Sequence, residues 1–112
     1  MNELSKAEEL FLSVIWRLKD NAYGVAIKRK IKELTGKDYK YGTLYFLLDQ
    51  LTNKELVQRF EGEPTNERGG RRKIYYKITQ EGVHALKESI EIHEKIWNGL
   101  DELFSQKGLK RG

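Results

Sequence analysis

The spacing of the hydrophobic residues changes twice along this chain, and these changes constrain the fold more than any other feature. Up to residue 54 the apolar residues recur at the three- and four-residue spacing of helices that bury one face. From Leu56 to Ile78 they alternate, as in β-strands, on both sides of a loop that contains the only proline. After Thr79 a spacing of three and four residues returns and continues to Phe104. The sequence therefore predicts several helices, then a hairpin, then one long final helix.

Three helices are expected before the hairpin. The first begins at a capping-box pattern formed by Ser5 and Glu8 and ends near Asp20. The second is expected over about residues 23–34, where Gly36 can adopt the left-handed backbone of a helix end. The third is expected over about residues 41–54, and its apolar residues form a buried stripe at Leu44, Leu47, Leu48 and Leu51.

The hairpin is expected to have strands at residues 56–61 and 73–78, joined by a loop at residues 62–72. This loop is too long for a tight turn, and long loops in compact domains are often functional. It carries Arg68, Arg71 and Arg72, and Lys73 follows at once. The hairpin therefore places four cations at or beside its tip.

The final helix is expected to run from about residue 80 to residue 106 without a break. Apolar or semi-apolar residues follow one another in steps of three and four for three heptads, which predicts a seam that packs against a second copy of the chain. Phe11 of the first helix is expected to join this dimer interface. His93 is interpreted as a polar residue that sets the register and not as a metal ligand, since the only other histidine lies on a different face. The seam comprises Val83, Leu86, Ile90, His93, Trp97, Leu100 and Phe104.

Composition excludes several classes of protein. The chain has no cysteine, which excludes a disulfide scaffold, a thiolate zinc site and a cysteine nucleophile. No apolar stretch is long enough to cross a membrane, and acidic residues near the N-terminus do not suit a signal peptide, so a cytoplasmic protein is expected. No metal-ligand spacing, nucleophile–base pair or phosphate-binding glycine loop appears. We therefore expect no enzymatic activity, no cofactor and no metal.

The positive charge is concentrated in the middle of the chain. The net charge is +4, but residues 26–78 hold 13 basic and 7 acidic side chains, while the segments before and after this range are each slightly acidic. Such asymmetry is typical of a region that faces a polyanion. A basic face in contact with solvent alone is an equally good interpretation of the charge by itself.

Three helices followed by a two-stranded hairpin predict a winged helix-turn-helix, a mainly α-helical fold with a small β-wing. In this motif the second helix of the pair enters the major groove of DNA with its N-terminal residues against the base edges. That helix is the third of this chain. Residues 1–79 are then the DNA-binding domain and residues 80–112 the dimerisation helix. The residues expected to contact DNA are Lys37, Lys40, Tyr41, Gly42, Thr43 and Tyr45 at the third helix, and Arg68, Arg71, Arg72 and Lys73 at the wing.

Two aromatic residues of the third helix have open roles at this point. Tyr45 can reach a phosphate or pack its ring against the wing. Phe46 can touch a thymine methyl group or pack on a neighbouring loop, and packing is the interpretation we prefer.

The chain resembles the PadR family of bacterial transcriptional regulators over about residues 8–88. The match comprises Tyr23-Gly24, Glu33-Leu34-Thr35-Gly36, Gly42-Thr43-Leu44-Tyr45, Leu51, Leu56-Val57, the wing segment Gly69-Gly70-Arg71-Arg72-Lys73-Ile74-Tyr75-Tyr76, and Ile78-Thr79-Gln80-Glu81-Gly82. The family commonly has proline just before the glycine and just after the tyrosine of the Gly-Thr-Leu-Tyr element, where this chain has Tyr41 and Phe46. The identity of the bases that are read therefore does not transfer.

The resemblance implies a dimeric repressor that binds an inverted repeat of double-stranded DNA, dimerises through its last helix, and is released by a small molecule or another signal. Paired Trp97 side chains, joined by Trp16, would suit a flat aromatic effector, although plain packing at the dimer interface is the simpler interpretation of Trp97. The alternative function is a winged-helix module that binds proteins without DNA.

Overall fold

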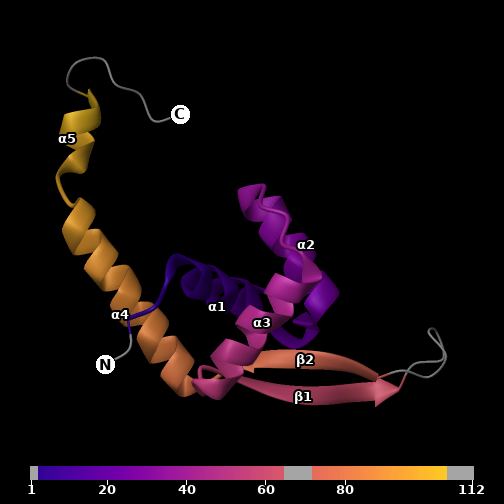
Figure 1. Cartoon of the computed structure of the whole chain (residues 1–112). Coiled ribbons are helices and arrows are strands. Elements are labelled where there is room, and N and C mark those ends of the chain that lie inside the picture. The colour runs from indigo at the N-terminus through magenta and orange to yellow at the C-terminus, as the bar shows by residue number, and fades with distance from the viewer. Residues whose placement is uncertain (1–2, 65–71, 106–112) are drawn as a thin grey trace.

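The computed structural model describes residues 3–64 and 72–105 as a three-helix bundle with a β-hairpin on one side and a helical arm on the other (Figure 1). The helices of the bundle are α1 (Lys6–Leu18), α2 (Gly24–Thr35) and α3 (Tyr41–Asn53), and a short 3₁₀ turn, η1 (Lys19–Asn21), follows α1. The hairpin consists of β1 (Val57–Pro64) and β2 (Arg72–Ile78). The arm consists of α4 (Gln80–Trp97) and α5 (Leu100–Ser105). This order confirms the predicted winged helix-turn-helix.

The helix ends lie where local chemistry predicts them. The Ser5 hydroxyl accepts from the backbone N–H of Glu8 at 3.1 Å, and the Glu8 carboxylate accepts from the backbone N–H of Ser5 at 2.9 Å. Both halves of the predicted capping box are therefore present. Gly36 ends α2 with a φ of 78°, and the Thr79 hydroxyl caps α4 by accepting from the backbone N–H of Gly82.

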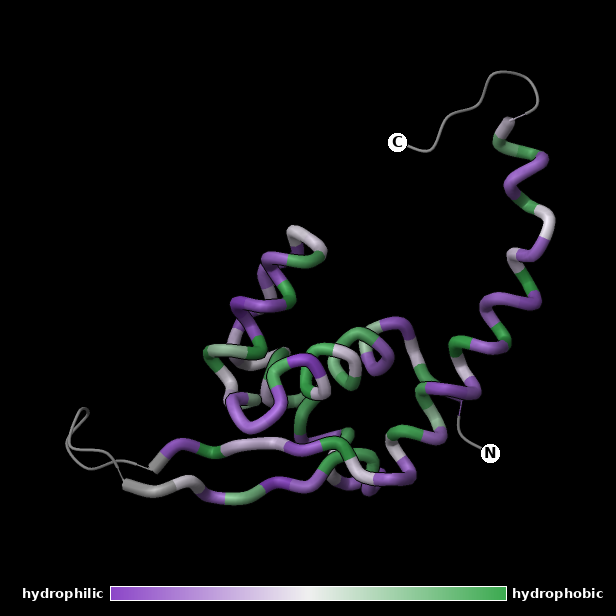
Figure 2. The backbone as a smooth tube through the Cα atoms, turned by 180° about the vertical axis from the view of Figure 1, so that it is seen from behind, coloured by the Kyte–Doolittle hydropathy of each residue, from purple (hydrophilic) through white to green (hydrophobic). Residues whose placement is uncertain are grey.

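The core lies where the bundle meets the root of the hairpin. Its fully or almost fully buried residues are Phe11, Leu12, Val14 and Ile15 of α1, Ala22 before α2, Ile27 and Ile31 of α2, Leu44, Leu48 and Leu51 of α3, and Leu56, Val57 and Tyr76 beside or within the hairpin. Figure 2 shows hydrophobic segments where these elements meet, and further hydrophobic segments along the arm. Leu86 of α4 packs against the core, whereas Val83, Ile90 and Ile96 are exposed. The fold thus leaves one apolar surface without a partner inside the protomer.

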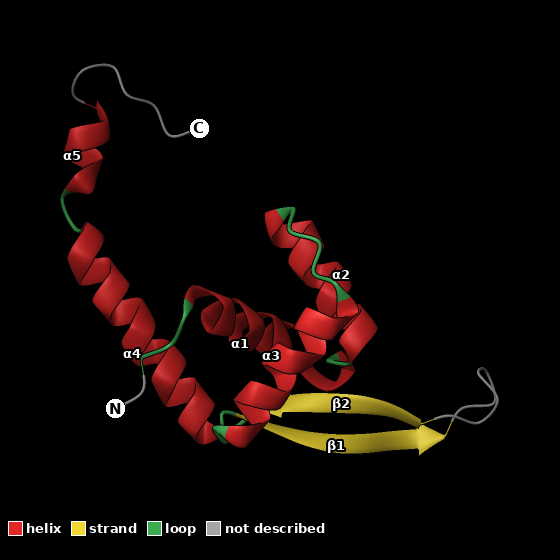
Figure 3. Ribbon diagram, in the orientation of Figure 1, coloured by secondary structure: helices red, strands yellow, loops and turns green. Residues whose placement is uncertain are grey.

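The hairpin is attached to the bundle by a third strand-like segment. β1 and β2 pair antiparallel, with Val57 opposite Ile78 and Phe60 opposite Tyr75 (Figure 3). On the other edge of β2, Tyr23 forms a bridge with Tyr75, and the Tyr76 backbone N–H donates to the Ala22 carbonyl at 2.8 Å. These bonds hold the base of the wing against the start of α2.

Three expectations from the sequence are corrected. The first strand continues to Pro64, three residues beyond its predicted end, because Pro64 still pairs with Arg72 after a register shift. The shift interrupts the alternation of side chains, which is why the sequence pattern stopped earlier. The final helix is broken between Trp97 and Leu100, since Gly99 takes a left-handed φ of 88°. Phe11, expected at the dimer interface, is fully buried in the protomer's own core and packs edge-on against Tyr39.

Among the described residues, no helix combines the length and hydropathy that spanning a membrane requires.

Candidate nucleic-acid interface

The start of α3 is an exposed, basic helix end. Lys37, Lys40, Tyr41, Gly42 and Thr43 are all exposed. Lys40 occupies the N-cap position and its side chain makes no capping hydrogen bond, so the backbone N–H groups of the first turn are not satisfied by it. Free N–H groups together with the helix dipole attract anions to a helix N-terminus. This end of α3 is therefore suited to a phosphate group.

The connection between α2 and α3 is held by an ion pair. The Lys28 ammonium donates to the Asp38 carboxylate at 2.5 Å, and Lys32 lies 3.9 Å from the other carboxylate oxygen. The hydrogen bond from Lys28, and then the charges of Lys28 and Lys32, hold the pKa of Asp38 below its ordinary value. The pair fixes the approach to α3, but it also neutralises cationic charge beside the helix end.

Tyr45 packs on the start of α2. A Cβ atom placed on Gly24 would lie 2.7 Å from the ring carbon that bears the Tyr45 hydroxyl, and closer still to the hydroxyl oxygen. Tyr45 therefore occupies space that only a glycine at position 24 leaves free. Its ring also stacks on Tyr41 with the ring centroids 6.2 Å apart, and the Tyr45 side chain remains 39% exposed.

Phe46 does not pack on a neighbouring loop, which corrects the interpretation preferred from the sequence. Its side chain is 66% exposed, more than any other large hydrophobic side chain in the described part of the chain. The buried stripe of α3 takes up the opposite face of the helix, so no packing surface is left for the ring.

The wing carries an aromatic ladder that sequence analysis missed. Phe60 stacks on Tyr75 with the centroids 5.8 Å apart, and Tyr75 meets Tyr23 edge-on at 5.6 Å. The Lys73 ammonium lies 4.2 Å from the centroid of the Tyr23 ring, a cation–π contact. Phe60 and Tyr75 are directly opposite in the sheet. The alternation of the two strands was the feature of the sequence that could have predicted this aromatic pair.

The predicted wing cations are only partly described. Lys73 is half-buried over Tyr23, which places its charge beside the start of α2 and not at the wing tip. Arg72 begins β2, and its side chain lies outside the described part. Arg68 and Arg71 lie outside the described residues altogether.

α4 is tied to α1 by a polar cluster that the sequence did not reveal. The Glu9 carboxylate accepts from the Ser89 hydroxyl and lies 2.8 Å from the His93 Nε2 atom. His93 in turn stacks on Trp97 at 5.1 Å. His93 therefore contacts its own protomer, and its role in setting a dimer register stays a prediction.

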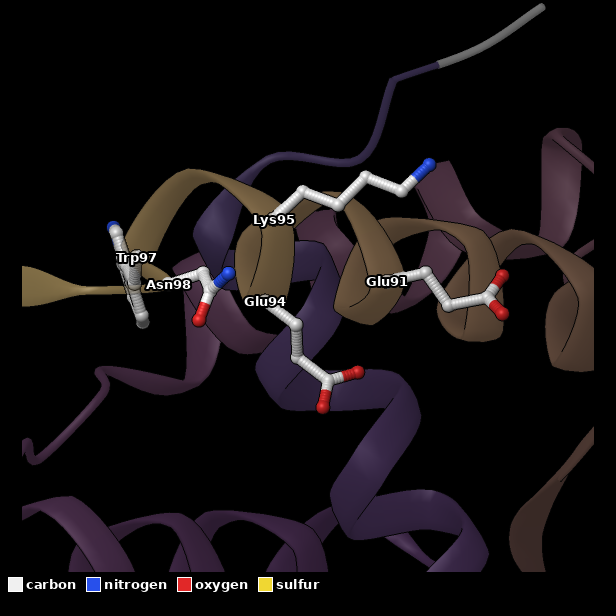
Figure 4. A pocket seen from close by; sticks show the side chains of 5 residues that line it. All are labelled: Glu91, Glu94, Lys95, Trp97 and Asn98. Carbon is white, nitrogen blue, oxygen red and sulfur yellow. The ribbon is translucent and has the colours of Figure 1, made fainter.

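The arm borders several depressions, of which one is a mainly apolar groove. A groove of about 450 Å³ lies between the end of α1 and α4, lined by the apolar residues Trp16, Ile78, Val83, Leu86 and Ile90. A hollow of about 690 Å³ lies at the end of α4, where Figure 4 shows Glu94 and Lys95 projecting to different sides beside Trp97. Trp97 also borders a smaller hollow with Leu100 and Phe104 of α5. Trp16 and Trp97, expected in one interface, therefore line different depressions.

A match to a family model establishes which family the chain belongs to. The model of the transcriptional regulator PadR-like family matches residues 12–88, which span α1 to the middle of α4. The chain belongs to this family. The resemblance seen in the sequence is thereby confirmed, and this PadR-like protein is a transcriptional regulator.

Solved structures of other proteins have the same fold. RosR of H. salinarum is 30% identical to this PadR-like protein, with a TM-score of 0.67 over 88% of this chain and 81% of that chain. A PadR family transcription regulator from Clostridium difficile is 26% identical, with a TM-score of 0.63 over 91% of this chain and 97% of that chain. A PadR-like regulator from Bacillus cereus, at 20% identity and a TM-score of 0.73 over 90% and 93% of the two chains, shares the fold. No curated protein matches the chain.

The PadR-like protein begins its third helix at Tyr41 without the proline that the family resemblance implied just before Gly42. The stacking of Tyr41 on Tyr45, with the Lys28 ammonium 5.3 Å from the Tyr41 ring, holds the start of the helix instead. The departure at Tyr41 therefore leaves the position of the helix as predicted.

Proposed function

We propose that this PadR-like regulator acts by binding a specific double-stranded DNA sequence as a dimer, and that it has no enzymatic activity. The observation that carries this proposal is the exposed, lysine-flanked start of α3, which projects from the same bundle that holds the base of the wing. A helix N-terminus in the major groove and a cationic wing beside it are complementary to DNA. The proposed contacts are Lys37, Lys40, Tyr41, Gly42, Thr43, Tyr45, Arg68, Arg71, Arg72 and Lys73.

The proposed roles within this set differ. Lys37 and Lys40 flank the helix end and suit phosphate groups, which fix the position of a protein on the duplex. Gly42 and Thr43 lie in the first turn of α3, where base edges are read. Tyr45 is held by the start of α2, so its exposed part is proposed to contact a phosphate at the rim of the groove.

The groove between α1 and α4 is proposed as the place where a second copy docks. Val83 and Ile90 are almost half exposed and Trp16 is 54% exposed, although all three side chains are apolar and lie together. Burying this surface against the arm of another protomer removes apolar area from water. The proposed interface residues are Trp16, Val83, Leu86, Ile90, Trp97, Leu100 and Phe104, with residues 80–112 as the dimerisation unit and residues 1–79 as the DNA-binding unit.

A two-fold dimer presents two α3 helices to two half-sites, so an inverted repeat is the proposed operator. We propose that binding represses transcription and that a signal releases it. The hollow at Trp97 lies next to His93, which is bonded to Glu9 of α1, so a flat aromatic molecule there would act on the joint between the arm and the DNA-binding unit.

Salt dependence of DNA binding tests the proposal. The upstream region of the protein's own gene is titrated with the full chain at several salt concentrations. The logarithm of the affinity is expected to fall linearly with the logarithm of the salt concentration, since bound cations displace counterions from DNA. Replacing Arg71 and Arg72 together by alanine should weaken binding and reduce the slope by about two for each bound protomer, or about four for the dimer.

The matched control is Lys95→Ala, which removes an exposed cation of α4 outside the proposed contacts. Binding that is independent of salt and survives the double arginine substitution would contradict the DNA-binding proposal. Retention of a defined protein partner without any DNA would instead support the protein-interaction alternative.

A further inference from the structure

Phe46 lies at the centre of the outward face of α3. Leu44, Leu48 and Leu51 of the same helix are fully buried, and Phe46 is about 200° around the helix axis from Leu44. The other large apolar side chains that are more than half exposed, Trp16, Ile96 and Trp97, belong to α1 and the arm. The ring of Phe46 is therefore separate from the proposed dimer surface and belongs to the helix that we propose enters the major groove.

The surface on the N-terminal side of Phe46 is open. Gly42 lies four residues earlier and so on the same face of the helix. A Cβ atom at Gly42 would have no atom within 4 Å, so the backbone of the first turn is accessible there. Since Cβ atoms of a helix tilt toward its N-terminus, the Phe46 side chain is directed toward this first turn. The ring and the bare backbone thus lie side by side at the start of α3.

Charge distinguishes the two parts of this helix end. Lys37 and Lys40 precede the helix and suit phosphate groups. The exposed carboxylate of Asp49 lies one turn after Phe46 and repels phosphate. An apolar ring followed by an acidic group is therefore suited to the floor of a groove, where base edges lie, and not to the sugar-phosphate backbone.

We propose that Phe46 is a specificity-determining residue that contacts the C5-methyl group of a thymine in the major groove. The inference rests on the proposed DNA-binding function. The methyl group of thymine is the largest apolar group that base edges present in this groove, where most of the other groups are hydrogen-bond donors or acceptors. An exposed aromatic ring without a packing partner recognises this methyl group by removing both surfaces from water.

Deoxyuridine provides the direct test, because it pairs as thymine does but lacks the methyl group. Binding sites are first selected from a random-sequence duplex library with the full chain. The best site is then synthesised again with deoxyuridine in place of thymine, one position at a time. The wild-type protein is expected to lose about fourfold in affinity at one thymine of each half-site, which corresponds to about 0.8 kcal/mol for one buried methyl-sized group.

Substitution of the ring completes the cycle. Phe46→Ala should bind the selected site more weakly and should lose the deoxyuridine penalty at that position, whereas Phe46→Leu should retain part of it. Asn53→Ala, at the far end of the same exposed face, is the matched control and should keep the full penalty. Since Phe46 is mostly exposed, its replacement leaves the core intact.

The possible failures are distinguishable. If a site is selected but no thymine is sensitive to deoxyuridine, or if Phe46→Ala keeps the penalty, the proposed contact is wrong while DNA binding stands. If Phe46→Ala binds the site as tightly as the wild type, the ring serves another partner and the contact is wrong. If the library yields no bound sequence, the proposed DNA-binding function fails and the contact with it.

Discussion

Gly82 sits at the joint between the wing and the arm, and its replacement by alanine should destabilise the protein. A Cβ atom at Gly82 would lie 2.8 Å from Cγ1 of Ile78 and 3.2 Å from the carbonyl carbon of Leu56, and closer still to the Leu56 carbonyl oxygen. Two of these three atoms belong to the backbone, so they cannot move aside as a flexible side chain can. The Leu56 oxygen also accepts a hydrogen bond from the Thr79 backbone N–H at 3.0 Å.

The magnitude follows from three opposing effects. Overpacking at a rigid site costs about 1–3 kcal/mol. Weakening the hydrogen bond from Thr79 to Leu56 adds about 1 kcal/mol. Alanine has a higher helix propensity than glycine, which returns at most about 1 kcal/mol. The free energy of unfolding of Gly82→Ala should therefore fall by about 2 kcal/mol, or about 8 °C in Tm for a domain of this size.

Urea denaturation followed by far-UV circular dichroism measures this difference, at one fixed protein concentration because the proposed dimerisation would contribute to apparent stability. Gly42→Ala is the matched control. Gly42 is also near the start of a helix, but a Cβ atom there meets nothing within 4 Å, so this variant should be as stable as the wild type or slightly more. If Gly82→Ala unfolds at the wild-type urea concentration, the steric reasoning is refuted. Equal destabilisation by both variants would refute it as well.

Three further predictions concern charge and assembly. Burial alone would raise the pKa of Glu8, but the hydrogen bond from Lys54 at 2.6 Å and those from Ser5 outweigh it and lower this pKa below 4.5. The stability that the Glu8 charge contributes is therefore present above pH 4.5 and is lost as the pH falls through the lowered pKa. Glu8→Gln should therefore be less stable than the wild type at pH 7 by about 1 kcal/mol, and this difference in unfolding free energy should shrink in acid. Thermal unfolding measures it, and a difference at pH 3 as large as at pH 7 would contradict the proposed effect of the Glu8 charge. Asp38→Asn should tighten DNA binding and steepen its salt dependence, because it frees the charge of Lys28. Fluorescence anisotropy measures both, and weaker binding would show that the ion pair contributes more by positioning α3 than it costs by neutralising Lys28. Ile90→Glu should convert the proposed dimer to a monomer, because it places an unpaired charge in the apolar groove. Sedimentation velocity at micromolar concentration measures this, and a wild-type protein that is already monomeric there would refute the dimer proposal.

Features that depend on a few neighbouring residues could be predicted from the sequence. The Ser5 capping box, the left-handed Gly36 and the Thr79 cap each act within one helical turn, so the helix boundaries follow from local chemistry. The buried stripe of α3 follows from helical periodicity. The order of helices and strands, and with it the winged helix-turn-helix, is the sum of such local signals.

The tertiary structure alone decided where side chains from distant segments meet. Tyr45 lies against Gly24, and Glu9 bonds to Ser89 and His93, although about eighty residues separate the two ends of this last cluster. Heptad spacing describes where apolar residues recur and carries no information on backbone conformation, so it could not show the break at Gly99. In the same way, hydrophobicity alone could not distinguish Phe11, which the bundle encloses, from Phe46, which it leaves exposed. Burial is a property of the packed elements and not of the residue, and this is why the sequence by itself determined the elements while only their packing decided which surfaces remain available to DNA and to a second protomer.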